Sequence, residues 1–270
     1  MKNVIIRSIT GIIYIAIIVG AILAGSLWMC ILSSLLAILA IDEFNRISDK
    51  NHIHPVLRVL DIIGGCAMIF AAYTLSSLND LFIFAIFAYI LYLIIRFVAP
   101  LYIHRDDPLS TTAHSMMGQM YTALPIAMLL CSYHISPNVV MLMFIMIWLN
   151  DTGAFCVGTL LGRHRLFERI SPKKSWEGFL GGLAFAITAG IVAATYMPSL
   201  IENRSTLSMA IFGVIVAVMS TWGDLVESQI KRTLNIKDSG KLLPGHGGIL
   251  DRIDSLLLVA PATLLYLLLS

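Results

Sequence analysis

Long apolar runs recur along almost the whole sequence, and they constrain its fold more than any other feature. A transmembrane helix needs about 20 mostly apolar residues, whereas a soluble domain usually has about 25% charged residues. This chain has 58% apolar and 13% charged residues. We therefore predict an all-α, polytopic membrane protein with about nine spans, at residues 9–24, 28–41, 56–73, 81–95, 116–133, 139–161, 179–197, 207–222 and 253–269.

Basic residues predict how these spans are oriented. If every run crosses once and the N-terminus is cytoplasmic, 17 of the 18 Lys and Arg residues lie inside and only Arg204 lies outside. Cytoplasmic loops of membrane proteins carry such an excess of Lys and Arg. We therefore expect a cytoplasmic N-terminus and an outer C-terminus, in a cell inner membrane, with any active site at the cytoplasmic face.

The sequence predicts one transmembrane domain over residues 1–270, with N-terminal membrane helices at 1–135 and a catalytic half at 136–270. Two expected inner segments, 162–177 and 223–254, are longer and more charged than the other loops. Secondary transporters often have interrupted helices in both halves, but here the charge gathers in the C-terminal half. This asymmetry counts against a transporter or channel, which stays the non-enzyme alternative.

One helical face near residue 224 combines acidic, hydroxyl and basic side chains. If the helix over 207–222 continues, Asp224, Ser228 and Lys231 share a face, with Glu227 beside them. Charge next to the hydrocarbon is costly and is usually paired or functional. Ordinary interfacial charges are the alternative interpretation for each of these residues.

Asp251 and Asp254 are three residues apart and lie on one face where the last helix is expected to begin. Mg²⁺ prefers oxygen ligands, often one or two carboxylates plus substrate phosphates. Asp224 and Asp251 could supply such carboxylates, and nearby Lys and Arg residues could neutralise phosphate oxygens. The pattern favours phosphoryl or nucleotidyl transfer.

The residues that carry this chemistry resemble a known family. The segment Ser228-x-x-Lys-Arg-x4-Lys-Asp-x-Gly-x-x-Leu-Pro-x-His-Gly-Gly-x-x-Asp-Arg-x-Asp254 resembles the complete signature of the phosphatidate cytidylyltransferases, also called CDP-diacylglycerol synthases. The resemblance extends to Asn150-Asp-Thr-Gly-Ala-Phe and to Ser171-Pro-Lys-Lys-Ser-Trp-Glu-Gly178. It is strong over most of the C-terminal half and rests on hydropathy alone in the N-terminal half.

The resemblance implies transfer of the CMP moiety of CTP to phosphatidic acid, giving CDP-diacylglycerol and pyrophosphate, with Mg²⁺ as cofactor. It also implies a lipid bilayer environment and a homodimer, and we expect no nucleic-acid partner. We predict catalytic roles for Asp224, Ser228, Lys231 and Asp251, and metal ligands at Asp224, Asp251, Asp254 and Asp151. The predicted substrate-binding residues are Lys173, Lys174, Arg232, Lys237, Asp238, His246, Gly247, Gly248 and Arg252.

Several alternatives remain open. Ser171 and Pro172 are expected to begin a helix, so that Lys173 and Lys174 project at the membrane boundary as phosphate ligands or as topology anchors. A CTP-dependent lipid kinase would also be a polytopic membrane protein, but it would release CDP and need a general base. His246 is expected to hold its loop or contact phosphate rather than act as that base.

Overall fold

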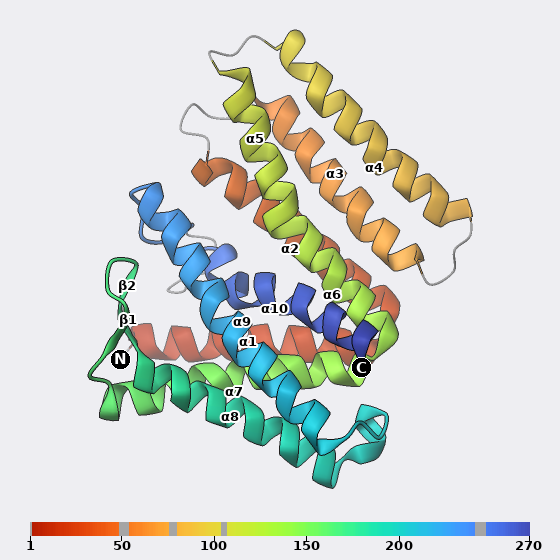
Figure 1. Ribbon diagram of the computed structural model, residues 1–270. Helices are drawn as coiled ribbons and strands as arrows, with labels where there is room; N and C mark the ends of the chain where they lie inside the picture. Colours follow the sequence, from red (N-terminus) through yellow and green to blue (C-terminus); the bar gives the residue numbers. More distant parts are fainter. Residues whose placement is uncertain (1, 49–53, 76–79, 104–106, 241–246) are drawn as a thin grey trace. The chain divides into compact units, whose positions relative to one another are not determined.

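Helices dominate the fold. The computed structural model describes residues 2–48, 54–75, 80–103, 107–240 and 247–270, with side chains from residue 10 onward. The α-helices are α1 (Lys2–Ala24), α2 (Ser26–Ser48), α3 (Pro55–Thr74), α4 (Asp80–Val98), α5 (Pro108–Gly118), α6 (Leu124–Ile135), α7 (Pro137–Leu161), α8 (Trp176–Tyr196), α9 (Thr206–Thr233) and α10 (Leu250–Leu269) (Figure 1). The shorter elements are η1 (Ala99–Leu101), the π-helical turn η2 (Gln119–Ala123), η3 (Pro198–Ile201), and the antiparallel strands β1 (Arg165–Phe167) and β2 (Ser171–Ser175).

Seven helices in the described ranges are long and apolar enough to cross a membrane, namely α2, α3, α4 with η1, α7, α8, α9 and α10. The described apolar part of α1, Thr10–Ala24, is shorter. The run expected at 116–133 is divided among α5, η2 and α6. Each predicted run is therefore helical, and the chain is a multi-pass membrane protein. The number of nine crossings stays a prediction.

The chain forms two compact units. The first comprises Met1–His134 and Asp238–Arg252, and the second comprises Ile135–Lys237 and Ile253–Ser270. In the first unit α3 packs against both α2 and α4, and Figure 1 shows α3 and α4 side by side. Phe84, Phe87 and Phe97 of α4 are exposed, as expected of a helix that faces lipid.

A buried ion pair ties the helices of the first unit together. Arg96 of α4 and Asp61 of α3 are both fully buried, with 3.2 Å between Nε and Oδ1. Arg96 also donates to Ser115 Oγ at 3.0 Å, while the hydroxyl of Tyr92 and the amide of Asn45 each donate to Asp61 at 3.1 Å. Because four helices contribute to this network, its charges are compensated by several partners at once.

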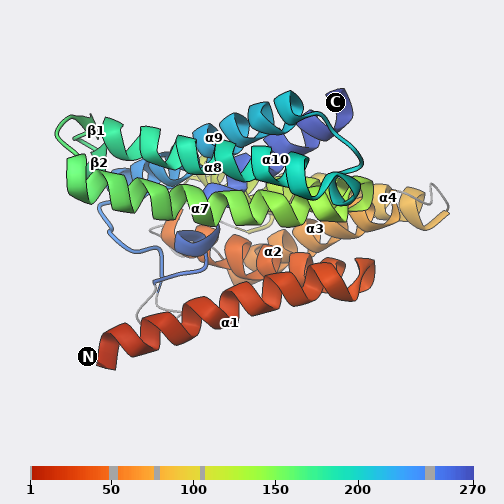
Figure 2. The same ribbon diagram turned by 90° about the horizontal axis from the view of Figure 1, so that it is seen from below.

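Small residues allow the helices of the second unit to approach closely. α8 packs along α7 and α9, as Figure 2 shows for α7 and α8. A Cβ built on Gly190 would lie 2.3 Å from the carbonyl oxygen of Met209, and one on Gly182 would lie 2.5 Å from Asn150 Oδ1. Glycine at such contacts lets membrane helices pack backbone to backbone.

The hairpin corrects one prediction from the sequence. Ser171 and Pro172 do not begin a helix, because Ser171–Ser175 forms β2 and pairs with β1. The first residue of α8 is Trp176, and its N-cap is Ser175, whose Oγ accepts a hydrogen bond from Gly178 N at 3.1 Å. Proline lacks a donor but fits an edge strand, so Pro172 is equally compatible with this strand.

Candidate active site

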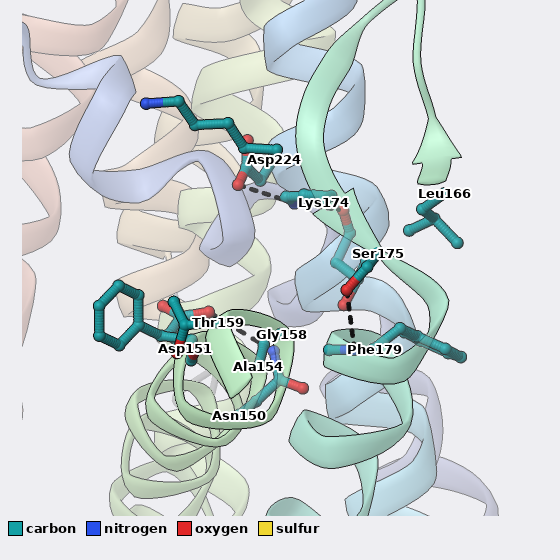
Figure 3. Close-up of a pocket in the computed structure, with 14 residues that line it drawn as sticks. Asn150, Asp151, Ala154, Gly158, Thr159, Leu166, Lys174, Ser175, Phe179 and Asp224 are labelled. Atoms are coloured by element: carbon teal, nitrogen blue, oxygen red, sulfur yellow. Dashed lines mark hydrogen bonds and ion pairs between the residues drawn. The ribbon is translucent and has the colours of Figure 1, made fainter. Parts of the chain in front are cut away.

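A cavity of about 420 Å³ lies within the second unit, where α7, α8, α9 and β2 meet. Its polar lining residues are Asn150, Asp151, Thr159, Lys173, Lys174, Ser175, Thr221 and Asp224. Figure 3 shows Asp151, Lys174 and Asp224 at this cavity. Phe155 and Phe179 add apolar surface. The fold therefore brings charged groups from distant sequence positions to one partly apolar cavity. Such a cavity suits a substrate that combines a charged headgroup with an apolar part.

An ion pair joins the hairpin to α9 at this cavity. Lys174 Nζ lies 2.7 Å from Asp224 Oδ2 and donates to the carbonyl oxygen of Thr221 at 3.3 Å. Ser228, one turn along α9, donates to Asp224 Oδ1 at 3.1 Å. The continuation of α9 to Thr233 confirms that Asp224, Ser228 and Lys231 belong to one helix. Both oxygens of Asp224 are thus oriented by neighbours.

Three carboxylates gather next to this ion pair. One oxygen each of Asp224, Glu227 and Asp254 lies within 4.8 Å of the others. Glu227 also forms an ion pair with Lys231, and Asp254 is close enough to Asp151 and Lys174 to interact electrostatically. Oxygen donors from carboxylates suit Mg²⁺, so the donor set of this cluster fits that ion.

Glu227 was not predicted as a metal ligand, although its spacing signals it. It follows Asp224 by three residues on α9, so the two side chains project from one face. The backbones of α9 and α10 also touch here, because a Cβ on Gly223 would lie 2.5 Å from the carbonyl oxygen of Asp254. This close contact brings Asp254 to the pair on α9.

Asn150 lines the cavity and is almost fully buried. Its side chain is only 2% exposed, and its Nδ2 donates to Ser220 Oγ at 3.4 Å. Its Oδ1 accepts no hydrogen bond from any described residue. This oxygen faces the backbone of α8, because a Cβ built on Gly182 would lie 2.5 Å from it.

Comparison with known proteins matches this chain to a family. The family model described as "Cytidylyltransferase family" matches residues 5–270. The chain belongs to the cytidylyltransferase family. Among similar proteins, the phosphatidate cytidylyltransferase of Staphylococcus saprophyticus is 31% identical over 95% of this chain and 96% of its own length. That of Mycobacterium tuberculosis is 48% identical over 43% of this chain and 34% of its own. The match thus spans about a third of the mycobacterial protein, and the predicted resemblance is confirmed.

In this cytidylyltransferase family member, Asp251 belongs to the first unit and accepts hydrogen bonds there. It lies in the first turn of α10, and its Oδ2 accepts hydrogen bonds from Ser239 N at 3.1 Å and Gly248 N at 2.8 Å. Gly247 has a positive φ of 81°, a conformation that favours glycine. Asp251 therefore shapes the loop before α10, and its catalytic and metal roles stay predictions.

The other predicted substrate-binding residues differ in their surroundings. Arg232 Nε donates to the carbonyl oxygen of Ile170 at 3.4 Å, which links the end of α9 to the hairpin. Lys237, Asp238 and Arg252 are exposed. His246 lies outside the described residues. The substrate contacts of all these residues stay predictions.

Glu177 is a residue of the hairpin region that sequence reasoning did not select. Its carboxylate accepts hydrogen bonds from the backbone N–H groups of Arg163, at 3.1 Å, and His164, at 3.2 Å. Its other oxygen lies 2.6 Å from His164 Nδ1. Glu177 thereby fixes the entry to the hairpin that carries Lys173 and Lys174.

Proposed function

We propose that this chain transfers the cytidylyl group of CTP to phosphatidate and releases pyrophosphate, giving CDP-diacylglycerol for phospholipid biosynthesis. The observation that carries the proposal is the 31% identity to the staphylococcal phosphatidate cytidylyltransferase over 95% of this chain. The cavity supports this proposal, because basic, acidic and apolar side chains all line it. The charged groups suit the phosphates of a nucleoside triphosphate and of the lipid, and the apolar surface suits the lipid.

Asp224, Glu227 and Asp254 would hold Mg²⁺, with Asp151 close by on the cavity wall. Bound Mg²⁺ would neutralise negative charge on the CTP phosphates and act as a Lewis acid. Lys174 keeps Asp224 oriented through their 2.7 Å ion pair. Lys173, Lys231, Arg232 and Lys237 supply further positive charge, which lowers the repulsion between two polyanionic substrates.

The reaction needs positioning more than proton transfer. An oxygen of the lipid phosphate attacks the α-phosphorus of CTP and forms the new P–O bond, while the bond from that phosphorus to the bridging oxygen breaks. Pyrophosphate leaves with the electron pair. Because the attacking oxygen is already ionised, no general base is required, and alignment of the substrates contributes most of the catalysis.

The membrane setting belongs to the same proposal. We expect the protein in the inner membrane of the cell, and the distribution of basic residues favours an N-terminus and an active site on the cytoplasmic side. The acyl chains of phosphatidate then stay in the bilayer while its phosphate reaches the cavity. A homodimer is the assembly that we expect.

The test is product formation by purified protein in detergent or lipid. With radiolabelled CTP, phosphatidate and Mg²⁺, we expect labelled CDP-diacylglycerol and one pyrophosphate per turnover. Omission of Mg²⁺ or addition of a chelator should stop the reaction. Release of CDP with a phosphorylated lipid would instead identify a lipid kinase, and absence of any lipid product would contradict the proposal.

A second prediction concerns the hairpin lysines. Lys174→Ala should raise the KM for CTP or phosphatidate about tenfold, because it removes a charge-assisted contact to Asp224 and a positive charge from the cavity. Steady-state kinetics with each substrate varied in turn measures this effect. Lys173 is exposed, so Lys173→Ala should have a smaller effect.

Arg169→Ala is the matched control for these lysine variants, since Arg169 is exposed between the two strands and is absent from the cavity lining. Its kinetics should equal those of the parent protein. Unchanged KM values for both substrates in Lys174→Ala would assign Lys174 to membrane topology alone.

A further inference from the structure

A carboxylate of the N-terminal half lies among the residues of the family signature. Glu43, in α2, is only 8% exposed. Burial of an ionised carboxylate is costly unless hydrogen bonds and opposite charges compensate it. The burial of Glu43 therefore calls for a structural or functional explanation. The proposed reaction assigns it no role.

Three donors from the signature segment compensate Glu43. Ser239 Oγ donates to Oε1 at 2.6 Å, Leu250 N donates to the same oxygen at 2.9 Å, and Ile249 N donates to Oε2 at 3.0 Å. All four residues belong to the first unit. The two backbone donors lie at the start of α10, where N–H groups have no partner within the helix.

Glycines of the signature leave room for this carboxylate. A Cβ on Gly248 would lie 2.1 Å from Glu43 Oε1, and one on Gly240 would lie 2.6 Å from Oε2. Asp251 is a second carboxylate that binds this segment, because its Oδ2 accepts hydrogen bonds from the N–H groups of Ser239 and Gly248. Two carboxylates thus hold the described residues on either side of positions 241–246.

We propose that Glu43 is a positioning residue for substrate binding, which holds Ser239–Gly240 and Gly248–Leu250 so that Arg252, in the first turn of α10, can bind a phosphate-bearing substrate. The inference rests on the proposed function. Asp251 and Glu43 already occupy the backbone N–H groups that they bind in these two segments. The phosphate contact therefore falls to Arg252, whose exposed guanidinium can donate charge-assisted hydrogen bonds. The phosphate could belong to CTP or to the lipid, and kinetics with each substrate distinguishes these two sources.

The decisive variant is Glu43→Gln, which keeps the shape of the side chain but loses its charge and places an amide against one of the donors. We expect the KM for CTP or for phosphatidate to rise about tenfold, with kcat within about threefold of the parent value. The substrate whose KM rises identifies the phosphate. Unchanged KM values for both substrates, or a fall in kcat alone, would overturn the inference.

Asp42→Asn is the matched control, because Asp42 precedes Glu43 on α2 and pairs with Arg46 and Arg58 rather than with the signature. Its KM values should equal those of the parent protein. If Glu43→Gln does not fold, Ser239→Ala removes one donor and should raise the same KM about twofold to threefold, and no rise would overturn the inference. Absence of product in the parent protein would contradict the proposed function instead.

Discussion

Asp224→Asn is expected to abolish CDP-diacylglycerol formation, with a loss of at least about a thousandfold in kcat/KM. Asp224 belongs to the three-carboxylate cluster, and it also anchors Lys174 at 2.7 Å. Asparagine has nearly the same shape but no charge, so the cluster loses a proposed metal ligand and Lys174 loses its anionic partner. The measurement is incorporation of labelled CTP into lipid over a range of Mg²⁺ concentrations.

The fold of this variant should survive, because the Asp224 side chain is 35% exposed and the substitution is isosteric. Its elution in size-exclusion chromatography and its thermal midpoint should match the parent protein. Glu202→Gln removes one negative charge from an exposed loop of the same unit and should leave turnover unchanged. Near-normal turnover of Asp224→Asn at the usual Mg²⁺ concentration would remove Asp224 from the proposed metal site.

Arg96→Met should produce the largest loss of stability. Arg96 and Asp61 are both fully buried, so the substitution leaves a buried carboxylate without its cationic partner. Removal of one member of a buried ion pair costs about 3–5 kcal/mol in the free energy of unfolding. The thermal midpoint in detergent should fall accordingly, and in membranes the protein should be degraded faster.

Two further variants separate this effect from a general effect of charge removal. The double variant Asp61→Asn with Arg96→Met removes both charges and should recover part of the lost stability. Arg58→Met breaks the half-exposed pair between Arg58 and Asp42, and such pairs contribute about 0–1 kcal/mol. An Arg96→Met protein as stable as the Arg58→Met protein would contradict a stabilising role for the buried pair.

The helices could be predicted because apolar runs leave few other structures in a membrane. The hairpin could not, since Ser171 and Pro172 suit a helix start as well as an edge strand, and pairing with β1 decides between them. The π-helical turn at Gln119–Ala123 could not be predicted from the apolar run at 116–133, because hydropathy does not distinguish π-helical from α-helical hydrogen bonding.

The site was predictable where its residues share a helix and less so where they come from distant segments. Asp224 and Ser228 are one turn apart, so their contact follows from helical spacing. Glu43 gave no local signal, because its donors lie about 200 residues later in the sequence and are mostly backbone groups. Asp251 was selected for its charge. In the structure its carboxylate accepts hydrogen bonds from two backbone N–H groups.

The contact between Gly223 and the main chain at Asp254 links membrane packing to the chemistry next to it. Position 223 has no space for a methyl group, since its Cβ would lie 2.5 Å from a carbonyl oxygen. This contact fixes how closely the backbones that carry Asp224 and Asp254 approach each other. A bulkier residue at this position would have to move α9 and α10 apart. It would thereby also displace Asp224 and Asp254, two of the proposed metal ligands, without touching either carboxylate.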